Sequence, residues 1–338
     1  MRTLLLAGLI LLLAACGEAS SPDMRAPATA GAGSVEPPVR RCINLSNALE
    51  APDEGDWGYR VRKSDLDRIA SAGFDTVRLP VRFSAHTGDK PPYRISPELL
   101  ERVSEIVLWA EAAGLKIIVD VHHFEEINAA PGEHIPRLKA IWHQLSVHFR
   151  GAPDTVLFEL LNEPHGRLTV RRMDRLNRQL LDIVRQIHPE RWVIVGSSQW
   201  NSPQAWLDSD PPRDRRSLQT IHYYAPFEFT HQGAPWLENP PPTGRSWGSE
   251  ADRAALSRDF DRVEAKLQRL DLPMLVGEFG VYRGVPAELR ARWSEAVRRE
   301  AESRGMGWCH WGFASAFRAY DPDEEAWLAP IYRALMAD

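Results

Sequence analysis

Residues 157–164 read L-F-E-L-L-N-E-P, and residues 275–280 read L-V-G-E-F-G. Each stretch is a short apolar run that stops at a glycine or proline, which is typical of a buried β-strand. Each run also delivers a glutamate near its end, Glu163 in the first and Glu278 in the second. The two stretches therefore predict two buried strands whose C-terminal ends each carry a carboxylate.

Further segments have the same apolar character, so eight strands are expected in all. They are residues 42–46, 76–80, 115–121, 155–161, 192–196, 219–223, 274–279 and 307–312. Helical patterns lie between them: Ser96 and Pro97 are typical of a helix start, and Leu256, Phe260 and Val263 repeat at helical spacing. Strands that alternate with helices imply a parallel sheet, and eight such units in about 300 residues imply an α/β fold, a (β/α)8 TIM barrel with a single catalytic domain.

Polar residues gather at the C-terminal ends of these strands, which is where barrel enzymes keep their active sites. They are Arg78, His122, His123, Asn162, Glu163, Trp200, Asn201, His222, Tyr224, Glu278 and Trp311. Any one of them could be a satisfied core residue, but burying polar groups costs free energy, so their shared position favours one common site. Two glutamates from different strands are what retaining glycoside hydrolysis requires, one as proton donor and one as nucleophile.

A long segment, residues 226–248, follows the sixth expected strand. Loops of this length in a compact domain are usually functional. The segment contains Trp236, with His231 and Gln232 shortly before it. We expect Trp236 to form the floor of a sugar subsite, because an aromatic face beside polar groups suits a sugar ring and its hydroxyls. The alternative is that Trp236 only anchors the loop.

Charge and spacing narrow the function further. The net charge is −5, from 41 basic and 46 acidic residues that are well mixed, so no basic stripe indicates a nucleic acid partner. A metal site is the alternative interpretation of His122, His123 and His222. However, adjacent strand residues point to opposite faces, and a metal-binding pair on one strand usually has H-x-H spacing. The sequence therefore predicts no metal and no other cofactor.

The N-terminus has the pattern of an export signal. Arg2 precedes an apolar run over residues 4–13 that is too short to span a membrane. The sequence L-A-A-C at residues 13–16 resembles a bacterial lipobox, which implies a signal peptide over residues 1–15, cleavage before Cys16 and a lipid on its thiol. Gly17 in place of aspartate points to the outer membrane, on its periplasmic or cell-surface side. Plain secretion is the alternative.

The composition also predicts the domain organisation. Residues 16–39 carry the lipidated cysteine and are rich in Ser, Pro, Ala and Gly, so we expect a flexible tether. The barrel is expected over residues 40–338. Cys42 and Cys309 fall in its first and last strands, and two buried free thiols are the favoured interpretation. A disulfide is the alternative, because those strands are neighbours in a closed barrel and export leads to an oxidising compartment.

Five motifs, V-R-L-P, D-V-H-H, N-E-P-H, H-Y-Y and G-E-F-G in this order, resemble glycoside hydrolase family 5, the cellulase family, from residue 41 to the C-terminus. The segments N-A-L-E-A-P (47–52), F-E-L-L-N-E-P-H (158–165) and P-F-E-F-T-H-Q-G-A-P-W (226–236) are similar to those of bacterial endo-β-1,4-glucanases in this family. The resemblance implies a retaining hydrolase that cleaves β-1,4-linked glucan by double displacement.

The resemblance also implies roles for the residues at the strand ends. Glu163 would be the acid/base and Glu278 the nucleophile. Arg78 and Tyr224 would bond the nucleophile, and His222 would orient the acid/base. We expect Arg78 and Tyr224 to lower the pKa of Glu278, and the charge of Glu278 to raise the pKa of Glu163.

The remaining implied roles concern the substrate. The residues expected to contact sugar are Asn47, His122, His123, Asn162, His231, Trp236 and Trp311, with Asn162 on the 2-hydroxyl. Gly312 stands where relatives often carry glutamate, and Cys42 and Ser46 where the family usually has glycine, so mannan, glucomannan or mixed-linkage glucan remain alternatives to cellulose. A catalytically silent, glycan-binding lipoprotein is the alternative of another class. We expect a monomer, attached to a membrane only through its lipid.

Overall fold

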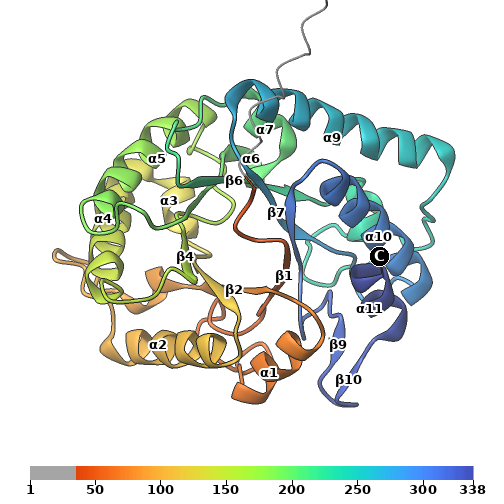
Figure 1. Ribbon diagram of the computed structural model, residues 1–338, viewed down its shortest axis with the longest axis horizontal. Coiled ribbons are helices and arrows are strands. Elements are labelled where there is room, and N and C mark those ends of the chain that lie inside the picture. The colour runs from red at the N-terminus through yellow and green to blue at the C-terminus, as the bar shows by residue number, and fades with distance from the viewer. Residues whose placement is uncertain (1–35, 338) are drawn as a thin grey trace, which may run out of the picture. The chain divides into compact units, whose positions relative to one another are not determined.

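The computed structural model describes residues 36–337. Within them, eight parallel strands form a closed barrel in sequence order (Figure 1). The strands are β1 (Arg41–Asn44), β2 (Thr76–Val81), β3 (Lys116–Val121), β4 (Val156–Glu159), β5 (Val193–Val195), β6 (Ser217–Tyr223), β7 (Met274–Phe279) and β8 (Gly307–His310). All eight expected strands are present, and the predicted TIM barrel is confirmed. The expected signal peptide and Cys16 lie outside the described residues.

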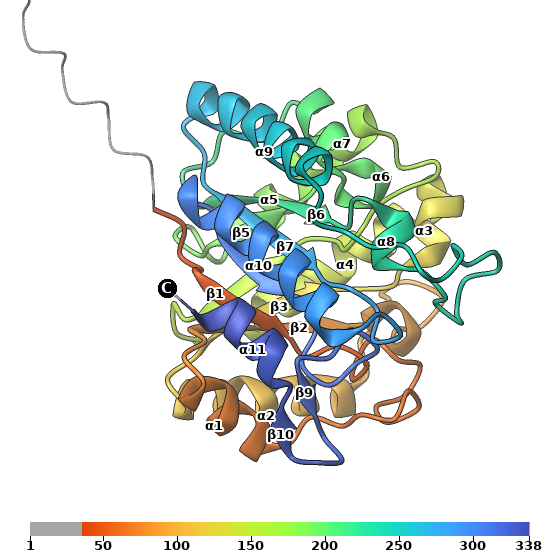
Figure 2. The ribbon, with the colours of Figure 1, turned by 90° about the vertical axis from the view of Figure 1, so that its right-hand side faces the viewer.

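Helices connect the strands and cover the outside of the barrel (Figures 1 and 2). The longer ones are α1 (Lys63–Ser71), α2 (Pro97–Ala112), α4 (Pro131–His148), α5 (Val170–Arg185), α7 (Pro203–Asp208), α9 (Glu250–Leu270), α10 (Ala287–Ser303) and α11 (Ala329–Met336). The short segments are η1 (Phe83–His86), α3 (Glu125–Ala129), α6 (Ser198–Asn201), α8 (Phe227–Thr230), β9 (Tyr320–Asp321) and β10 (Ala326–Trp327). Helix α2 begins as predicted, because Ser96 caps the Leu99 N–H and Pro97 is the first helical residue.

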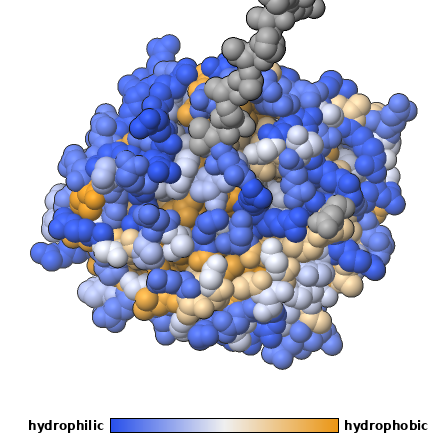
Figure 3. All heavy atoms as spheres, viewed as in Figure 1, coloured by the Kyte–Doolittle hydropathy of each residue, from blue (hydrophilic) through white to orange (hydrophobic). Residues whose placement is uncertain are grey.

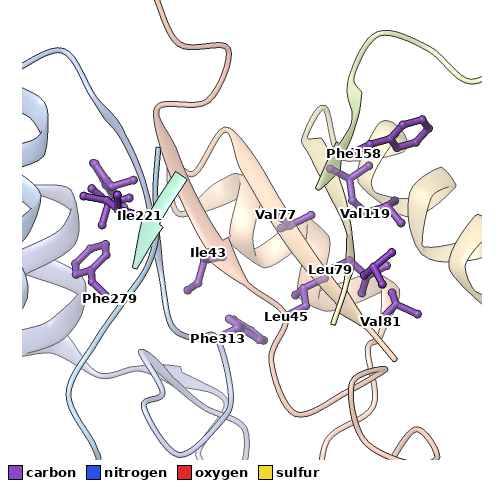
Figure 4. Close-up of a cluster of buried hydrophobic side chains, with 14 of the residues drawn as sticks. Ile43, Leu45, Val77, Leu79, Val81, Val119, Phe158, Ile221, Phe279 and Phe313 are labelled. Carbon is purple, nitrogen blue, oxygen red and sulfur yellow. The ribbon is translucent and has the colours of Figure 1, made fainter. Parts of the chain in front are cut away.

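Buried apolar side chains form two clusters. The larger packs the strands against the surrounding helices, and Figure 4 labels members of it from β1, β2, β3, β4, β6 and β7. The smaller contains Cys42, Ile118, Leu157, Ile194, Leu218, Leu275 and Cys309. Because these residues come from strands all round the barrel and still contact one another, this second cluster fills the barrel interior.

The interior changes from apolar to polar along the strands. Successive strand residues point to opposite faces, so the inward position after Cys42, Ile118 and Leu157 falls on Asn44, Asp120 and Glu159 respectively. These three polar residues are fully buried. The apolar layer thus supports a polar layer at the C-terminal end of the barrel, and the candidate site is built there.

Cys42 and Cys309 form a disulfide between β1 and β8. The favoured interpretation of two free thiols is therefore wrong. Closure of the barrel makes β1 and β8 neighbours, and the two cysteines are paired in register, so their side chains enter the interior at the same level. The sequence contained both cysteines, but only barrel closure determines their register.

The surface has mixed character. On the face drawn in Figure 3 most residues are hydrophilic, and hydrophobic residues show in smaller patches between them. This agrees with the well-mixed acidic and basic residues of the sequence. Across residues 36–337, none of the helices combines the length and the apolar character needed to cross a bilayer.

Candidate active site

Glu163 and Glu278 meet at the C-terminal end of the barrel. Glu278 belongs to β7, and Glu163 follows the end of β4 in a left-handed backbone conformation with a φ of 44°. His222 Nδ1 lies 2.8 Å from Glu163 Oε1 and 3.6 Å from Glu278 Oε2. A carboxylate oxygen of each glutamate and a ring nitrogen of His222 lie within 4.8 Å of one another. Carboxyl groups this close suit retaining glycoside hydrolysis, which uses a separation of about 5–5.5 Å.

Two donors orient Glu278. Arg78 Nη1 donates to Glu278 Oε1 at 2.9 Å, and the Tyr224 hydroxyl donates to Oε2 at 3.0 Å. Burial and the charge of Glu278 raise the pKa of Tyr224 well above its ordinary value, so the hydroxyl keeps its proton and remains a donor. Both oxygens of the carboxylate are therefore held in place.

Arg78 is itself fully buried, and its guanidinium is saturated with acceptors. Nε and Nη2 donate to the two carboxylate oxygens of Glu159 at 2.7 and 2.8 Å. Nη1 also donates to Asn44 Oδ1, and Nη2 to Asn162 Oδ1, both at 2.9 Å. A buried cation needs such partners to offset the loss of water, and the same partners leave the guanidinium one orientation.

Burial raises the pKa of Glu163 to about 7 and that of Glu278 also to about 7. Arg78 and Tyr224 lower the pKa of Glu278, as expected, but burial and the charge of Glu163 outweigh them, so the net shift is upward. Burial lowers the pKa of His222, so its ring is neutral. Two coupled carboxyl groups with raised pKa values share a proton near neutral pH, the state in which one can donate a proton while the other attacks.

The two glutamates open onto a cavity of about 1180 Å³. Among the residues expected to contact sugar, those that line it are Asn47, His122, His123, His231, Trp236 and Trp311. His222 and Tyr224 line it as well, whereas Arg78 and Asn162 are buried beside it. The His122 ring stacks on Trp311, with centroids 5.6 Å apart and planes 5° from parallel. Asn201, also named from the sequence, is buried with its Nδ2 3.4 Å from Nε2 of His222. The site residues named from the sequence within the described chain thus lie in or beside one cavity.

Two exposed aromatic rings at the cavity rim, Trp57 and Trp200, were given no contact with sugar in the sequence analysis. Trp57 is 43% exposed and meets His123 edge-on at 5.7 Å, and Trp200 is 56% exposed and stacks on His165 at 4.7 Å. Both line the cavity. The sequence places Trp200 at a strand end, whereas Trp57 lies in a loop whose path the sequence does not specify.

Three buried acids were also missed. Glu50 lines the cavity and accepts the N–H groups of Asn47 and Ala48, and burial raises its pKa to about 8. Asp120 and Glu159 lie on β3 and β4 and face Arg78. Asp120 and Glu159 could have been identified from the sequence, because each is an acid at an inward position of an otherwise apolar strand.

Glu163, His222 and Glu278 also offer the ligand atoms that a metal ion could use. Arg78 already supplies a positive charge to one oxygen of Glu278, and the neutral Tyr224 hydroxyl donates to the other. This donor set suits acid/base and nucleophilic chemistry on two carboxylates, without a step that needs a metal.

The chain has recognisable relatives among curated proteins. Endoglucanase H of Acetivibrio thermocellus is 34% identical over 268 residues, which are 79% of this chain and 29% of that protein. Endoglucanase A of Ruminococcus albus is 31% identical over 296 residues, 79% of each chain. The chain spans 29% and 39% of the length of Endoglucanase H and of Cellulase/esterase CelE, both from Acetivibrio thermocellus.

Solved structures agree with this likeness. A hyperthermophilic endo-β-1,4-glucanase in complex with substrate has a TM-score of 0.87 at 34% identity, over 89% of this chain and 97% of that one. Cel5A of Thermotoga maritima in complex with mannotriose has a TM-score of 0.85 at 38% identity, over 88% and 97%. The family model described as cellulase, glycosyl hydrolase family 5, matches residues 42–316. The chain therefore belongs to glycosyl hydrolase family 5, the cellulase family.

Proposed function

We propose that this protein is a retaining endo-β-1,4-glucanase acting on cellulose-type or mixed-linkage β-glucan. The observation that carries the proposal is the pair Glu163 and Glu278, close together around His222 at the mouth of a family 5 barrel. Further support comes from the relatives named endoglucanase. Neither a metal nor an organic cofactor enters the proposed reaction.

In the proposed first step, protonated Glu163 donates its proton to the glycosidic oxygen as ionised Glu278 attacks the anomeric carbon. The bond to the leaving sugar breaks, and a glycosyl ester forms on Glu278. The ester carries no charge, so the repulsion that opposed ionisation of Glu163 is gone and its pKa falls. Glu163 then takes a proton from water as the water attacks the same carbon, and the ester bond breaks to release Glu278 as a carboxylate. The product keeps its configuration, and both glutamates return to their starting states.

The surrounding residues have supporting roles in this mechanism. Arg78 and Tyr224 would hold Glu278 in line with the anomeric carbon, since each bonds one of its oxygens. Neutral His222 would orient Glu163 through Nδ1. Asn162, bonded to Arg78, would hold the sugar 2-hydroxyl. The sugar-contacting set is Asn47, His122, His123, His231, Trp236 and Trp311.

Endo action is proposed from the distribution of aromatic rings. Trp57 follows β1 and Trp200 follows β5, and these two strands are opposite each other in the closed order of the barrel. Both rings are partly exposed and line the same cavity as the glutamates. Platforms on opposite flanks suit a polysaccharide that continues in both directions past the cleavage point.

Activity assays on four polysaccharides test this proposal and its alternatives. Purified protein is assayed for reducing sugar and for loss of viscosity on carboxymethylcellulose, barley β-glucan, glucomannan and mannan. We expect release from the glucans with a viscosity loss that runs ahead of reducing ends. Mannan is a specific alternative, because Cel5A of Thermotoga maritima was solved with mannotriose and with cellobiose. Binding without release on every polymer would favour a silent, glycan-binding lipoprotein instead.

The pH dependence of kcat/KM should be bell-shaped with a maximum near neutral pH. Well below about 7 both Glu163 and Glu278 are protonated and the nucleophile is lost, whereas well above it both are ionised and the proton donor is lost. Tyr224→Phe removes a hydrogen bond to ionised Glu278, so its acid limb should move to higher pH. Initial rates on a soluble glucan at constant ionic strength measure both profiles. A flat wild-type profile from about pH 4 to about pH 9 contradicts the assignment.

We also propose that the protein is exported and held at the outer membrane through a lipid on Cys16, a residue outside the described part of the chain. Cys16→Ser removes the acceptor thiol, so the variant should leave the membrane fraction or remain unprocessed. Fractionation after cell breakage, followed by immunoblotting, measures this. A wild type that is wholly in the soluble fraction would favour plain secretion. Cys16 is the sole cysteine outside the Cys42–Cys309 pair, so the variant leaves that disulfide intact.

A further inference from the structure

One buried carboxylate touches both the sugar-facing side and the nucleophile side of the site. Asp120 is a β3 residue with no exposed surface. Its Oδ2 lies 2.5 Å from Nδ1 of His122, within hydrogen-bond distance, and 3.0 Å from Nη2 of Arg78. His122 borders the cavity, and Arg78 donates to Glu278. A single oxygen atom therefore connects two groups with different roles.

The contact with Asp120 determines which ring nitrogen of His122 carries the hydrogen and which one faces sugar as an acceptor. Burial, with Arg78 nearby, lowers the pKa of His122 well below its ordinary value, so the ring is neutral and carries one N–H. When Asp120 is ionised its oxygen can only accept, which places that hydrogen on Nδ1 and leaves Nε2 as an acceptor. The ring cannot turn away easily, because it is stacked on Trp311. Sugar hydroxyls would thus meet an acceptor at His122 rather than a donor.

The contact with Arg78 completes a clamp around the guanidinium. Glu159 grips Arg78 from one side through Nε and Nη2, and Asp120 meets Nη2 from the neighbouring strand. These contacts leave Nη1 directed at Asn44 and Glu278. Without one of these anionic partners the guanidinium could rotate, and the hydrogen bond from Arg78 to Glu278 would weaken.

We propose that Asp120 is a positioning residue for the glycosidase reaction: through Oδ2 it makes His122 a hydrogen-bond acceptor for sugar and holds Arg78 against Glu278. This inference rests on the proposed function. Asp120 touches neither the reacting atoms nor the cavity, so it acts through its two neighbours. The inference goes beyond the two glutamates, because it makes substrate binding and nucleophile orientation depend on the same buried side chain.

The charge of Asp120 also acts on the catalytic pair. Burial raises the pKa of Asp120 to about 7, against the opposing charge of Arg78. The charged and titratable groups that interact with it are Arg78, His122, Glu159 and Glu163. Among these, the charge of Asp120 raises the pKa of Glu163, in addition to the larger effect of burial. Its other oxygen, Oδ1, has no hydrogen-bond partner within residues 36–337. An asparagine could therefore keep its oxygen at the Oδ2 position and place its amide nitrogen where Oδ1 lies.

Two substitutions separate geometry from charge. Asp120→Ala removes the contact with His122 and the ion pair with Arg78, so KM on a soluble glucan should rise and kcat should fall, for a combined loss of kcat/KM of about 10²-fold. Asp120→Asn keeps the shape and the acceptor and removes the charge, so KM should return close to the wild-type value. Its alkaline limb should move to lower pH by about half a unit or more, because the pKa of Glu163 falls.

Histidine NMR gives a readout that does not depend on activity. In ¹⁵N-histidine-labelled wild type, His122 should carry its hydrogen on Nδ1, with the signal assigned by its absence from His122→Gln. Asp120→Asn should keep this tautomer, and Asp120→Ala should populate the Nε2–H form. A wild type with His122 protonated on Nε2 overturns the inference without any variant, even if Asp120→Ala does not fold.

Two further variants serve as matched controls. Glu159→Gln weakens the clamp on Arg78 but has no contact with His122 in the described chain, so it should lower kcat and leave KM and the tautomer unchanged. Asp65→Asn removes an equally buried acid on α1 that is bonded to Tyr59 and Arg62, so it should lower the melting temperature without moving either kinetic constant.

The outcomes distinguish this inference from the proposed function. A wild type without activity on any polymer would refute the glucanase proposal and leave the His122 tautomer as the test of Asp120. An active wild type, with Asp120→Ala unchanged in KM and in tautomer, would refute the positioning role and leave the glucanase proposal standing. A loss of melting temperature alone, with normal kinetics per folded molecule, would assign Asp120 to the fold and also refute the inference.

Discussion

Glu278→Gln and Glu163→Gln should each give a folded protein whose kcat on a soluble glucan is reduced by at least ~10²–10⁴-fold. An amide cannot attack the anomeric carbon as a carboxylate does, and it cannot donate a proton to the leaving oxygen. The neighbours of position 278 keep partners, since Arg78 can still donate to the amide oxygen and the Tyr224 hydroxyl can accept from the amide nitrogen. Reducing-sugar release per folded molecule is the measurement, with melting temperature recorded in parallel.

Glu278→Ala adds a test of which glutamate is the nucleophile. A small anion such as azide can enter the space left by the side chain and attack from the same face, so azide should restore activity and give a glycosyl azide of inverted configuration. Glu228→Gln is the matched control, since Glu228 is an exposed carboxylate of α8 paired with Arg245. Near-normal turnover of Glu278→Gln or Glu163→Gln would remove that residue from the mechanism.

Trp236→Ala should weaken catalysis on a soluble glucan by about 5- to 150-fold in kcat/KM, which corresponds to roughly 1–3 kcal/mol of lost sugar contact. The ring is 49% exposed and lines the cavity of the two glutamates. It leans on Phe317 at 5.7 Å and meets Tyr282 edge-on at 5.0 Å. Because so much of the ring is open to solvent, its removal should leave the melting temperature nearly unchanged.

Trp247 provides the matched comparison within the same loop. It is 3% exposed, packs near Phe229 and lies under the guanidinium of Arg253. Trp247→Ala should therefore destabilise the fold by about 3–5 kcal/mol and change kcat/KM little per folded molecule. If Trp236→Ala instead lowered the melting temperature strongly and left kcat/KM unchanged, Trp236 would be a loop anchor and the subsite interpretation would be wrong.

Local sequence patterns were sufficient for the fold and for the principal residues of the site. The eight apolar runs end at glycine, proline or polar residues, and that pattern is local, so each strand could be placed to within a few residues. The expected strands at 155–161 and 307–312 continue past the observed ends at Glu159 and His310. Those extra residues still lead into the site, because parallel strands of a barrel all end on the same side.

The electrostatics of the site were only partly predictable. The sequence indicated that Arg78 and Tyr224 would contact Glu278, and they do. It did not indicate that burial would outweigh them and raise the pKa of Glu278 to about 7. The pKa of a carboxyl group depends on how completely the whole fold shields it from water, and a short sequence motif does not indicate the extent of that burial.

By itself, the sequence determined which strands form, in which order, and which two glutamates stand at their ends, because these features depend on neighbours in the chain. Only the tertiary structure decided the pairing of Cys42 with Cys309, the place of Trp57 beside His123, and the link from Asp120 to His122 and Arg78. Each of these is set by the register of distant strands or the path of a loop. Closure of the barrel sets the distances between the strand-end residues. Those distances decide which groups share a proton, a hydrogen bond or a covalent bond.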